Sequence, residues 1–297
     1  MLKATFTVSE DEAGLRIDVL CAKKFPELSR SRWQKHGKFN YNGVAKPAKA
    51  KTKTGDNWEV SCAPETISDN LKPWDHPLKV LAESDSWVVI EKPYGIAVHP
   101  SISDTSQKTV VNALVHQFGQ QLSENFDEIE GRQIPRPGLV HRLDKTTSGV
   151  MLIAKNNAAH TYFQDHWKDF SKQYQCVVQG KTPPSGKIES GITRDPHNRQ
   201  RMTAANSEKS KWSVTEFERL DDDVRTDNHL SLLQVKILTG RTHQIRVHLS
   251  SIGFSVIGDV LYGGPKADRV MLHAQKLTFT DPDNDNAEVM VESEVPF

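Results

Sequence analysis

The sequence predicts an α+β protein in which a small basic α+β domain precedes a larger domain with a mixed, largely antiparallel sheet. Charge is segregated along the chain: eleven Lys and Arg face only two acidic residues between Arg16 and Lys53, although Lys+Arg and Asp+Glu balance at 38 each overall. Residues 63–77 carry prolines and aspartates without periodicity, as linkers do. Downstream, strand-like and helix-like segments alternate. We expect domains at 1–65 and 79–297, joined by a linker at 66–78.

The basic segment should contain two short helices and a small sheet. Apolar residues at helical spacing between 17 and 21 predict a first helix, which should end just before Pro26, because proline disfavours helical backbone in the preceding residue. Ser29 is suited to cap a second short helix. The Asn42-Gly43 pair predicts a turn, and residues 55–61 predict a closing strand.

The basic residues of this segment could follow phosphates along one face of the small domain. A solvated basic surface is the usual explanation for such a run, but the near absence of acidic partners favours RNA or DNA. The zero net charge of the whole chain argues only mildly against a nucleic-acid partner, because the charge is segregated. The residues expected to bind RNA are Arg16, Arg30, Arg32, Lys35, Lys46, Lys49, Lys51 and Lys53.

In the larger part, the spacing of apolar residues predicts strands and helices. Residues 78–93 predict a hairpin that turns at 83–86, and residues 109–118 predict a helix. The apolar run from Val150 predicts a buried strand. The remaining elements are a helix with Ala159, Phe163, Trp167 and Phe170 on one face, a strand with Tyr174, Cys176 and Val178 on one side, and a strand over 229–240.

A strand-to-helix junction follows at Leu238–Gly253. Thr242 is suited to cap a helix whose apolar stripe is Ile245, Leu249 and Ile252, and Gly253 suits the position after the helix end.

Two arginines at this junction are not needed for folding. Arg241 precedes the expected helix and Arg246 lies on it, so an anionic partner, phosphate or carboxylate, is one interpretation. A surface helix with ordinary charges is the other. His243 and His248 are five residues apart and do not form the i, i+4 pair of a helical zinc site, so we expect no metal.

Asp144 lies in the segment GLVHRLDKTTSG, residues 138–149, at the mouth of the strand that begins near Val150. A carboxylate there is costly unless it is paired or used chemically, although a solvated aspartate in a loop is the simpler alternative. The segment lacks the glycine spacing of a phosphate-binding loop, and Ser148 lacks the context of a hydrolase nucleophile. A single carboxylate remains, with arginines available to keep it ionised.

Residues 141–155, HRLDKTTSGVMLIAK, resemble the signature of the RluA family of pseudouridine synthases. Residues 88–100 resemble the first motif of that family, residues 172–180 its Lys-x-Tyr strand, and residues 239–264 and 272–277 its third motif and the segment that follows. These segments occur in the order of the family and span roughly residues 80 to 297. The basic segment is similar to the S4-like RNA-binding domain, through residues 14–20, 25–32, 42–43 and 53–60.

The resemblance implies roles for residues that match the motifs of the family. Asp144 matches the catalytic nucleophile, Tyr174 the tyrosine that stacks on uracil and can take its proton, and Arg246 the arginine paired with the aspartate. Arg142 matches the residue that replaces the flipped nucleotide in the RNA. His141, Arg241 and Thr242 are expected to contact the substrate. The glycosidic bond is broken and remade without net oxidation or hydrolysis, so we expect neither cofactor nor metal.

The substrate implied by the resemblance is structured RNA, with ribosomal large-subunit RNA favoured because the S4-like domain is common among such members. Alternatives are a transfer-RNA synthase, a catalytically silent RNA-binding or ribosome-assembly protein, and an RNA glycosylase. Two departures are visible: Thr146 stands where the family often has aspartate, a change that should be tolerated, and residues 33–41 make the small domain about one helical turn shorter than expected.

The cysteines and the distribution of apolar residues indicate the cellular compartment of the protein. Cys21, Cys62 and Cys176 are far apart and form no metal-type pairs, which is typical of a reducing environment. The first residues lack the apolar region of a signal peptide, and no stretch approaches the roughly 18 apolar residues of a membrane span. We therefore expect a monomeric cytoplasmic protein with no membrane partner.

Overall fold

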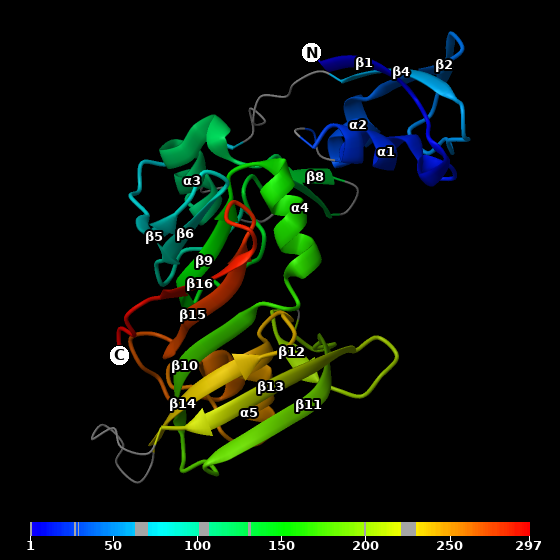
Figure 1. Ribbon diagram of the computed structural model, residues 1–297. Helices are drawn as coiled ribbons and strands as arrows, with labels where there is room; N and C mark the ends of the chain where they lie inside the picture. Colours follow the sequence, from blue (N-terminus) through cyan, green and yellow to red (C-terminus); the bar gives the residue numbers. More distant parts are fainter. Residues whose placement is uncertain are drawn as a thin grey trace.

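The computed structural model describes residues 2–297 except 27, 29, 63–70, 101–106, 130–131, 199 and 221–229 (Figure 1). Two sheets dominate it. The first is a four-stranded antiparallel sheet near the N-terminus, in the order β1-β4-β2-β3, accompanied by two short helices. Its elements are β1 (Leu2–Thr7), a 3-10 turn (Glu10–Glu12), α1 (Ile17–Lys24), α2 (Arg30–His36), β2 (Lys38–Tyr41), β3 (Val44–Lys46) and β4 (Asn57–Cys62).

This basic segment has its own core. Ile17 and Leu20 of α1 pack with Trp33 of α2 and with Phe39 and Trp58 of the sheet, all fully or almost fully buried. The elements predicted for it are therefore present, and α1 ends before Pro26 as expected. The predicted turn at Asn42-Gly43 is confirmed by left-handed backbone at both residues, φ 49° and 76°. Ser29, the expected cap of α2, lies outside the described residues.

The second sheet has ten strands, in the order β12-β11-β13-β14-β10-β15-β9-β6-β5, with β16 also paired to β15. Of its described pairs, only β9 and β15 run parallel, so the predicted mixed and largely antiparallel sheet is confirmed. Its strands are β5 (Lys79–Glu83), β6 (Trp87–Lys92), β9 (Ser148–Ala154), β10 (Ser171–Gln179), β11 (Ser185–Arg194), β12 (Met202–Ala204), β13 (Lys211–Arg219), β14 (Leu230–Ile237), β15 (Leu272–Asp281) and β16 (Ala287–Glu292).

Helices and a small hairpin complete this part of the chain. These elements are α3 (Val110–Phe118), α4 (Asn157–His166), α5 (Gln244–Ser251), the hairpin β7 (Phe126–Ile129) with β8 (Arg132–Pro135), and 3-10 turns at Gly119–Gln121 and Val260–Tyr262. No helix among the described residues is both long enough and apolar enough to cross a lipid bilayer.

Strand β9 is buried along its whole length because helices cover both of its faces. Met151 and Ile153 point toward the core that α3 closes, whereas Val150 and Leu152 point toward α4. Burial on both faces explains why this strand is an unbroken apolar run rather than an alternating one. Helix α5 covers the other half of the sheet, β10 and β14, and forms a third core there (Figure 1).

Two predicted helix boundaries are wrong. Helix α4 ends at His166, so Trp167 and Phe170 lie beyond it, although Phe170 still packs against Phe163. The cap of α5 is His243 rather than Thr242, and Ile252 is 41% exposed rather than part of the apolar stripe. Gly253, φ 88°, does follow the helix end as predicted.

The predicted linker is partly packed. Leu71, Trp74 and Leu78 contact the core beneath α3, and the Trp74 backbone N–H donates to the carbonyl of Asn112. The chain therefore joins the larger core some residues before β5. The division into domains at 1–65 and 79–297 stays a prediction.

Gly149 allows β9 and β15 to run side by side at the start of β9. Its backbone is left-handed, φ 117°, and a Cβ at this position would lie 2.1 Å from the carbonyl oxygen of Ala274. Ser148 and Gly149 pair there with His273 and Ala274 in the parallel register. Only glycine tolerates this close approach, which explains the Ser-Gly that follows Asp144 in the sequence.

We predict that Gly149→Ala lowers the free energy of unfolding by more than about 3 kcal/mol, because the methyl group would separate the two strands. Urea denaturation monitored by tryptophan fluorescence would measure this. Gly95→Ala is the matched control: Gly95 also has positive φ, but no atom lies within 4 Å of its added Cβ. It should cost only about 1–2 kcal/mol, and equal losses for the two variants would contradict the packing argument.

Candidate active site

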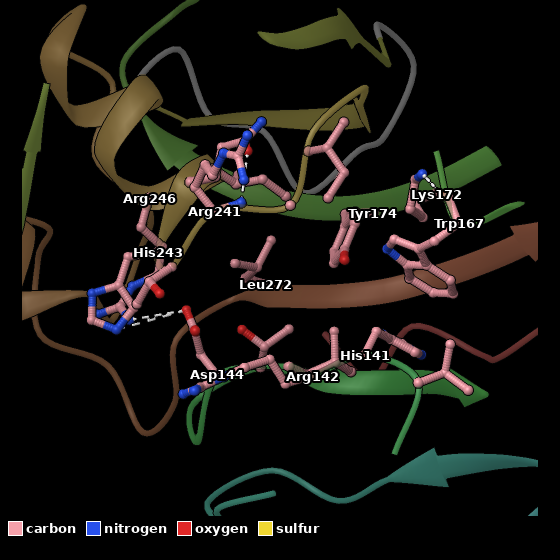
Figure 2. Close-up of a pocket in the computed structure, with 18 residues that line it drawn as sticks. His141, Arg142, Asp144, Trp167, Lys172, Tyr174, Arg241, His243, Arg246 and Leu272 are labelled. Carbon is pink, nitrogen blue, oxygen red and sulfur yellow. Dashed lines mark hydrogen bonds and ion pairs between the residues drawn. The ribbon is translucent and has the colours of Figure 1, made fainter. Parts of the chain in front are cut away.

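A pocket of about 280 Å³ opens at the centre of the large sheet (Figure 2). The segment before β9 forms one wall, and the segment between β14 and α5 forms the facing wall, with β10 between them. The side chains that line it include His141, Arg142, Asp144, Trp167, Lys172, Tyr174, Arg241, Thr242, His243, Arg246 and Leu272. Its volume lies at the lower end of the range for small-molecule sites.

Asp144 is presented by a loop that is fixed on both sides. The backbone N–H of Thr147 donates to the Asp144 carbonyl at 3.1 Å, and the N–H of Gly95 donates to the Lys145 carbonyl at 2.9 Å. The ammonium of Lys92 donates to the carbonyls of Pro93 and Thr147, both at 2.8 Å. The Asp144 carboxylate is thereby held at the pocket wall, 17% exposed.

Arg246 joins two carboxylates. Its Nε and Nη2 donate to the two oxygens of Asp259 at 2.6 and 2.8 Å, and its Nη1 donates to Asp144 Oδ2 at 3.3 Å. Burial alone would lower the pKa of Arg246, but the hydrogen bonds and the charge of Asp259, with the charge of Asp144, raise it. The guanidinium is therefore a permanent cation beside Asp144, and its anionic partners are carboxylates of the protein itself.

Tyr174 lies in the seam between two of the hydrophobic cores. It sits beside a register shift in the pairing of β10 with β15 and faces into the pocket (Figure 2). Burial and, to a lesser extent, the charge of Asp144 raise the pKa of the Tyr174 phenol. The ring is therefore neutral at physiological pH and offers a flat apolar face.

His141 supports the loop rather than standing free in the pocket. Its Nε2 accepts the backbone N–H of Leu152 at 2.9 Å, and its ring stacks on Trp167 with centroids 4.3 Å apart. Burial lowers the pKa of His141 to about 3, so the imidazole is neutral. The other expected substrate contacts, Arg142, Arg241 and Thr242, are exposed residues at the pocket.

Residues at or next to this pocket that were not predicted from the sequence include Lys92, Trp167, Lys172, His243, Asp259 and Tyr262. Asp259 offered a signal, because a carboxylate within the otherwise apolar segment 256–262 needs a partner if it is buried, and it is 1% exposed. Tyr262 packs its ring 4.9 Å from the Arg246 guanidinium. Within the described part of the chain, no group of three or more His, Cys, Asp or Glu is arranged to hold a metal ion.

The basic residues of the N-terminal segment are not all equivalent. Lys46, Lys49, Lys51 and Lys53 are exposed along one stretch of chain. Arg16 and Arg30 both pair with Asp18 and remain partly or largely exposed. Arg32 is 2% exposed and pairs with Glu124 at 2.7 Å, so it lies inside the protein rather than on the surface expected for RNA. The side chain of Lys35 lies outside the described residues.

Known proteins share this sequence pattern and this fold. Residues 86–251 match the RNA pseudouridylate synthase family. Ribosomal large subunit pseudouridine synthase D of Xanthomonas campestris is 35% identical and aligns over 93% of this chain and 84% of its own; the protein of that name from Neisseria meningitidis is 34% identical over 98% and 78%. Among solved structures, human RNA pseudouridylate synthase domain containing 1 superposes with a TM-score of 0.58 at 26% identity, covering 74% and 84%.

Lys92 should make the free energy of unfolding depend on pH. Burial lowers its pKa to about 7 in the folded protein, and the charge of Asp144 only partly opposes this shift. The unfolded chain therefore binds more protons than the folded one above pH 7, so this group adds stability as the pH rises. Relative to Lys92→Met, we predict that the wild type gains about 2 kcal/mol in unfolding free energy between pH 7 and pH 9.

Urea denaturation at both pH values measures this difference. Lys145→Met, an exposed lysine of the same loop, is the control and should follow the wild type. Parallel curves for wild type and Lys92→Met would mean that Lys92 stays charged in the folded protein.

Proposed function

The chain belongs to the RluA family of RNA pseudouridine synthases, which are isomerases that act on RNA, and we propose that it converts uridine to pseudouridine in large-subunit ribosomal RNA with Asp144 as the nucleophile. The observation that carries this proposal is the ion pair of Asp144 with Arg246 in a pocket closed by Tyr174. The names of the relatives from Xanthomonas and Neisseria support the ribosomal substrate. A transfer RNA is the second candidate substrate.

The reaction breaks the bond from ribose C1′ to uracil N1 and forms a bond from C1′ to C5. The proton on C5 is lost and N1 holds a proton in the product, so the composition of the nucleotide is unchanged. The permanent cation of Arg246, whose Nη1 donates to Asp144 Oδ2 at 3.3 Å, lies beside the proposed nucleophile. Because this contact is single and long, the carboxylate remains available to attack.

Tyr174 is proposed to hold the uracil by stacking. The target nucleotide must leave its helix, and the lost stacking costs a few kcal/mol. An aromatic ring that stacks on the base offsets roughly 1–3 kcal/mol of this cost. The raised pKa of Tyr174 supports a neutral stacking ring over a phenolate base. We propose that Arg142, exposed at the mouth of the pocket, takes the place of the flipped nucleotide in the RNA.

The N-terminal segment is proposed to be an S4-like RNA-binding domain that increases the affinity for RNA but takes no part in the reaction. The exposed row from Lys46 to Lys53 supports this role, whereas buried Arg32 is better explained as a structural contact to Glu124. We further propose that the protein works as a cytoplasmic monomer. An RNA-binding protein without activity is the alternative of a different class.

We predict that Asp144→Asn abolishes turnover, by on the order of 10⁴-fold or more, because removal of a nucleophile leaves only binding. Pseudouridine would be mapped in total RNA from cells lacking the protein and restored with wild type, Asp144→Asn or Asp165→Asn. Asp165 is exposed on α4, so its variant is the matched control and should restore the modification. Retained activity of Asp144→Asn would overturn the assignment, and loss at a transfer RNA would change the substrate.

A second prediction concerns the basic row. Replacing Lys46, Lys49 and Lys51 by Ala should weaken RNA binding and reduce the log–log salt slope by about 0.7 for each phosphate of a single strand that is no longer neutralised. Filter binding at several salt concentrations measures this. The triple variant of Lys168, Lys181 and Lys266, which are exposed lysines of the larger part, is the control. Equal slopes for the two triple variants would mean that the row does not contact RNA.

A further inference from the structure

His243 has left-handed backbone, which is uncommon for residues other than glycine. Its φ is 57°, in the left-handed region where glycine is at ease and other residues are strained. It caps α5, and glycine, which has no Cβ, would adopt this conformation without strain. Strained residues of this kind concentrate at functional sites, where the surrounding structure holds them for a purpose. The imidazole lines the pocket beside Asp144 (Figure 2).

The hydrogen bonds of Tyr262 set the tautomer of His243. The backbone N–H of Met202 donates to the Tyr262 hydroxyl at 2.9 Å, so the hydroxyl proton is free to be donated. The hydroxyl lies 2.8 Å from His243 Nδ1, and we infer that it donates its proton to this nitrogen, which then carries none itself. Burial lowers the pKa of His243 although the charge of Asp144 opposes this, and the ring is neutral. Its one proton is thus on Nε2.

The Nε2–H donor points toward Asp144 but does not bind it. Nε2 lies 3.9 Å from Asp144 Oδ2, beyond the 2.7–3.2 Å of a protein hydrogen bond. The donor is therefore still available in a pocket that also holds the carboxylate. The proposed reaction places C1′ of the uridine beside Asp144, and the ribose 2′-hydroxyl and uracil O2 are oxygens on either side of its glycosidic bond.

We propose that His243 is a further catalytic residue, a neutral hydrogen-bond donor to an oxygen next to the glycosidic bond of the bound uridine. Two oxygens offer this chemistry: the ribose 2′-hydroxyl, and O2 of the uracil, which gains negative charge as the C1′–N1 bond breaks. Tyr262 is a positioning residue that acts through His243 by fixing the proton on Nε2. The proposal rests on the proposed function, because it requires uridine in this pocket.

The decisive variant is His243→Gly, which removes the donor and also relieves the backbone strain. We expect kcat to fall by about 10²–10³-fold, the usual loss for a preorganised donor, with KM changed less than about threefold. The urea midpoint should stay unchanged or rise, whereas a merely structural histidine would lose stability. His243→Gln places an amide N–H near the position of Nε2 and should recover about tenfold, and Tyr262→Phe should lower kcat by about tenfold.

The assay counts the C5 proton released from RNA labelled with tritium at C5 of uracil, with RNA from cells lacking the protein as substrate. A target RNA carrying 2′-deoxyuridine at the modified position identifies the acceptor. If the 2′-hydroxyl is the acceptor, His243→Gly does not lower kcat any further on the 2′-deoxyuridine substrate. If O2 is the acceptor, His243→Gly still lowers kcat on that substrate.

Failure of this inference can be distinguished from failure of the proposed function. A fully active His243→Gly enzyme beside an inactive Asp144→Asn enzyme would overturn this inference alone. A fall in kcat that matches a fall in the urea midpoint would also overturn it. A wild-type enzyme that releases no tritium would overturn the proposed function, and this inference with it.

Discussion

The guanidinium of Arg246 organises the site, because it joins three segments of chain through two carboxylates. Asp259 takes the bidentate contact, and Asp144, 102 residues before Arg246 in the chain, takes a single longer one. A buried ion is tolerated only when partners satisfy its hydrogen bonds. Asp259 accepts two of the hydrogen bonds that Arg246 donates, so the cation lies beside Asp144 without locking it in a tight pair. The proposed role of Asp144 as a nucleophile needs this freedom.

The sheet brings these segments together at one point. Strands β9 and β15 lie side by side at Gly149, where the missing side chain lets the backbones approach, and this fixes the loop that carries Asp144. Strand β10 lies on the other side of β15 and contributes Tyr174. Helix α5 packs on β10 and β14 and brings Arg246 to the same place. The pocket is therefore a consequence of strand order.

Most helices and strands could be predicted from the sequence because they are determined by the spacing of apolar residues close together in the chain. The apolar run of β9, the helix α3 and the alternation around Tyr174 follow directly from period and burial. Helix ends were less predictable. The apolar spacing of α4 continues to Phe170 because residues beyond the helix pack in the same core, and α5 starts with Gln244, whose side chain accepts the N–H of Arg241 in place of a Thr242 cap.

Residues that act through distant contacts could not be found from the sequence in the same way. Nothing near Asp259 indicates that its partner is Arg246, and nothing near Lys92 indicates that its ammonium holds the loop of Asp144, because both contacts form only in the folded chain. The same holds for Arg32, whose charge suggested RNA but whose partner is Glu124. Charge in a sequence indicates a need for a partner, and the fold decides which partner meets it.

Several energetically unfavourable features lie at or beside this pocket. A buried pair such as Arg246–Asp259 adds little stability compared with well-packed apolar residues. A buried lysine beneath the Asp144 loop and a histidine in left-handed backbone are further local costs. A protein that only bound RNA through its exposed basic row would gain nothing from them. What they share is that they surround one carboxylate and hold it accessible and fixed in position, as the proposed role of Asp144 as a nucleophile requires.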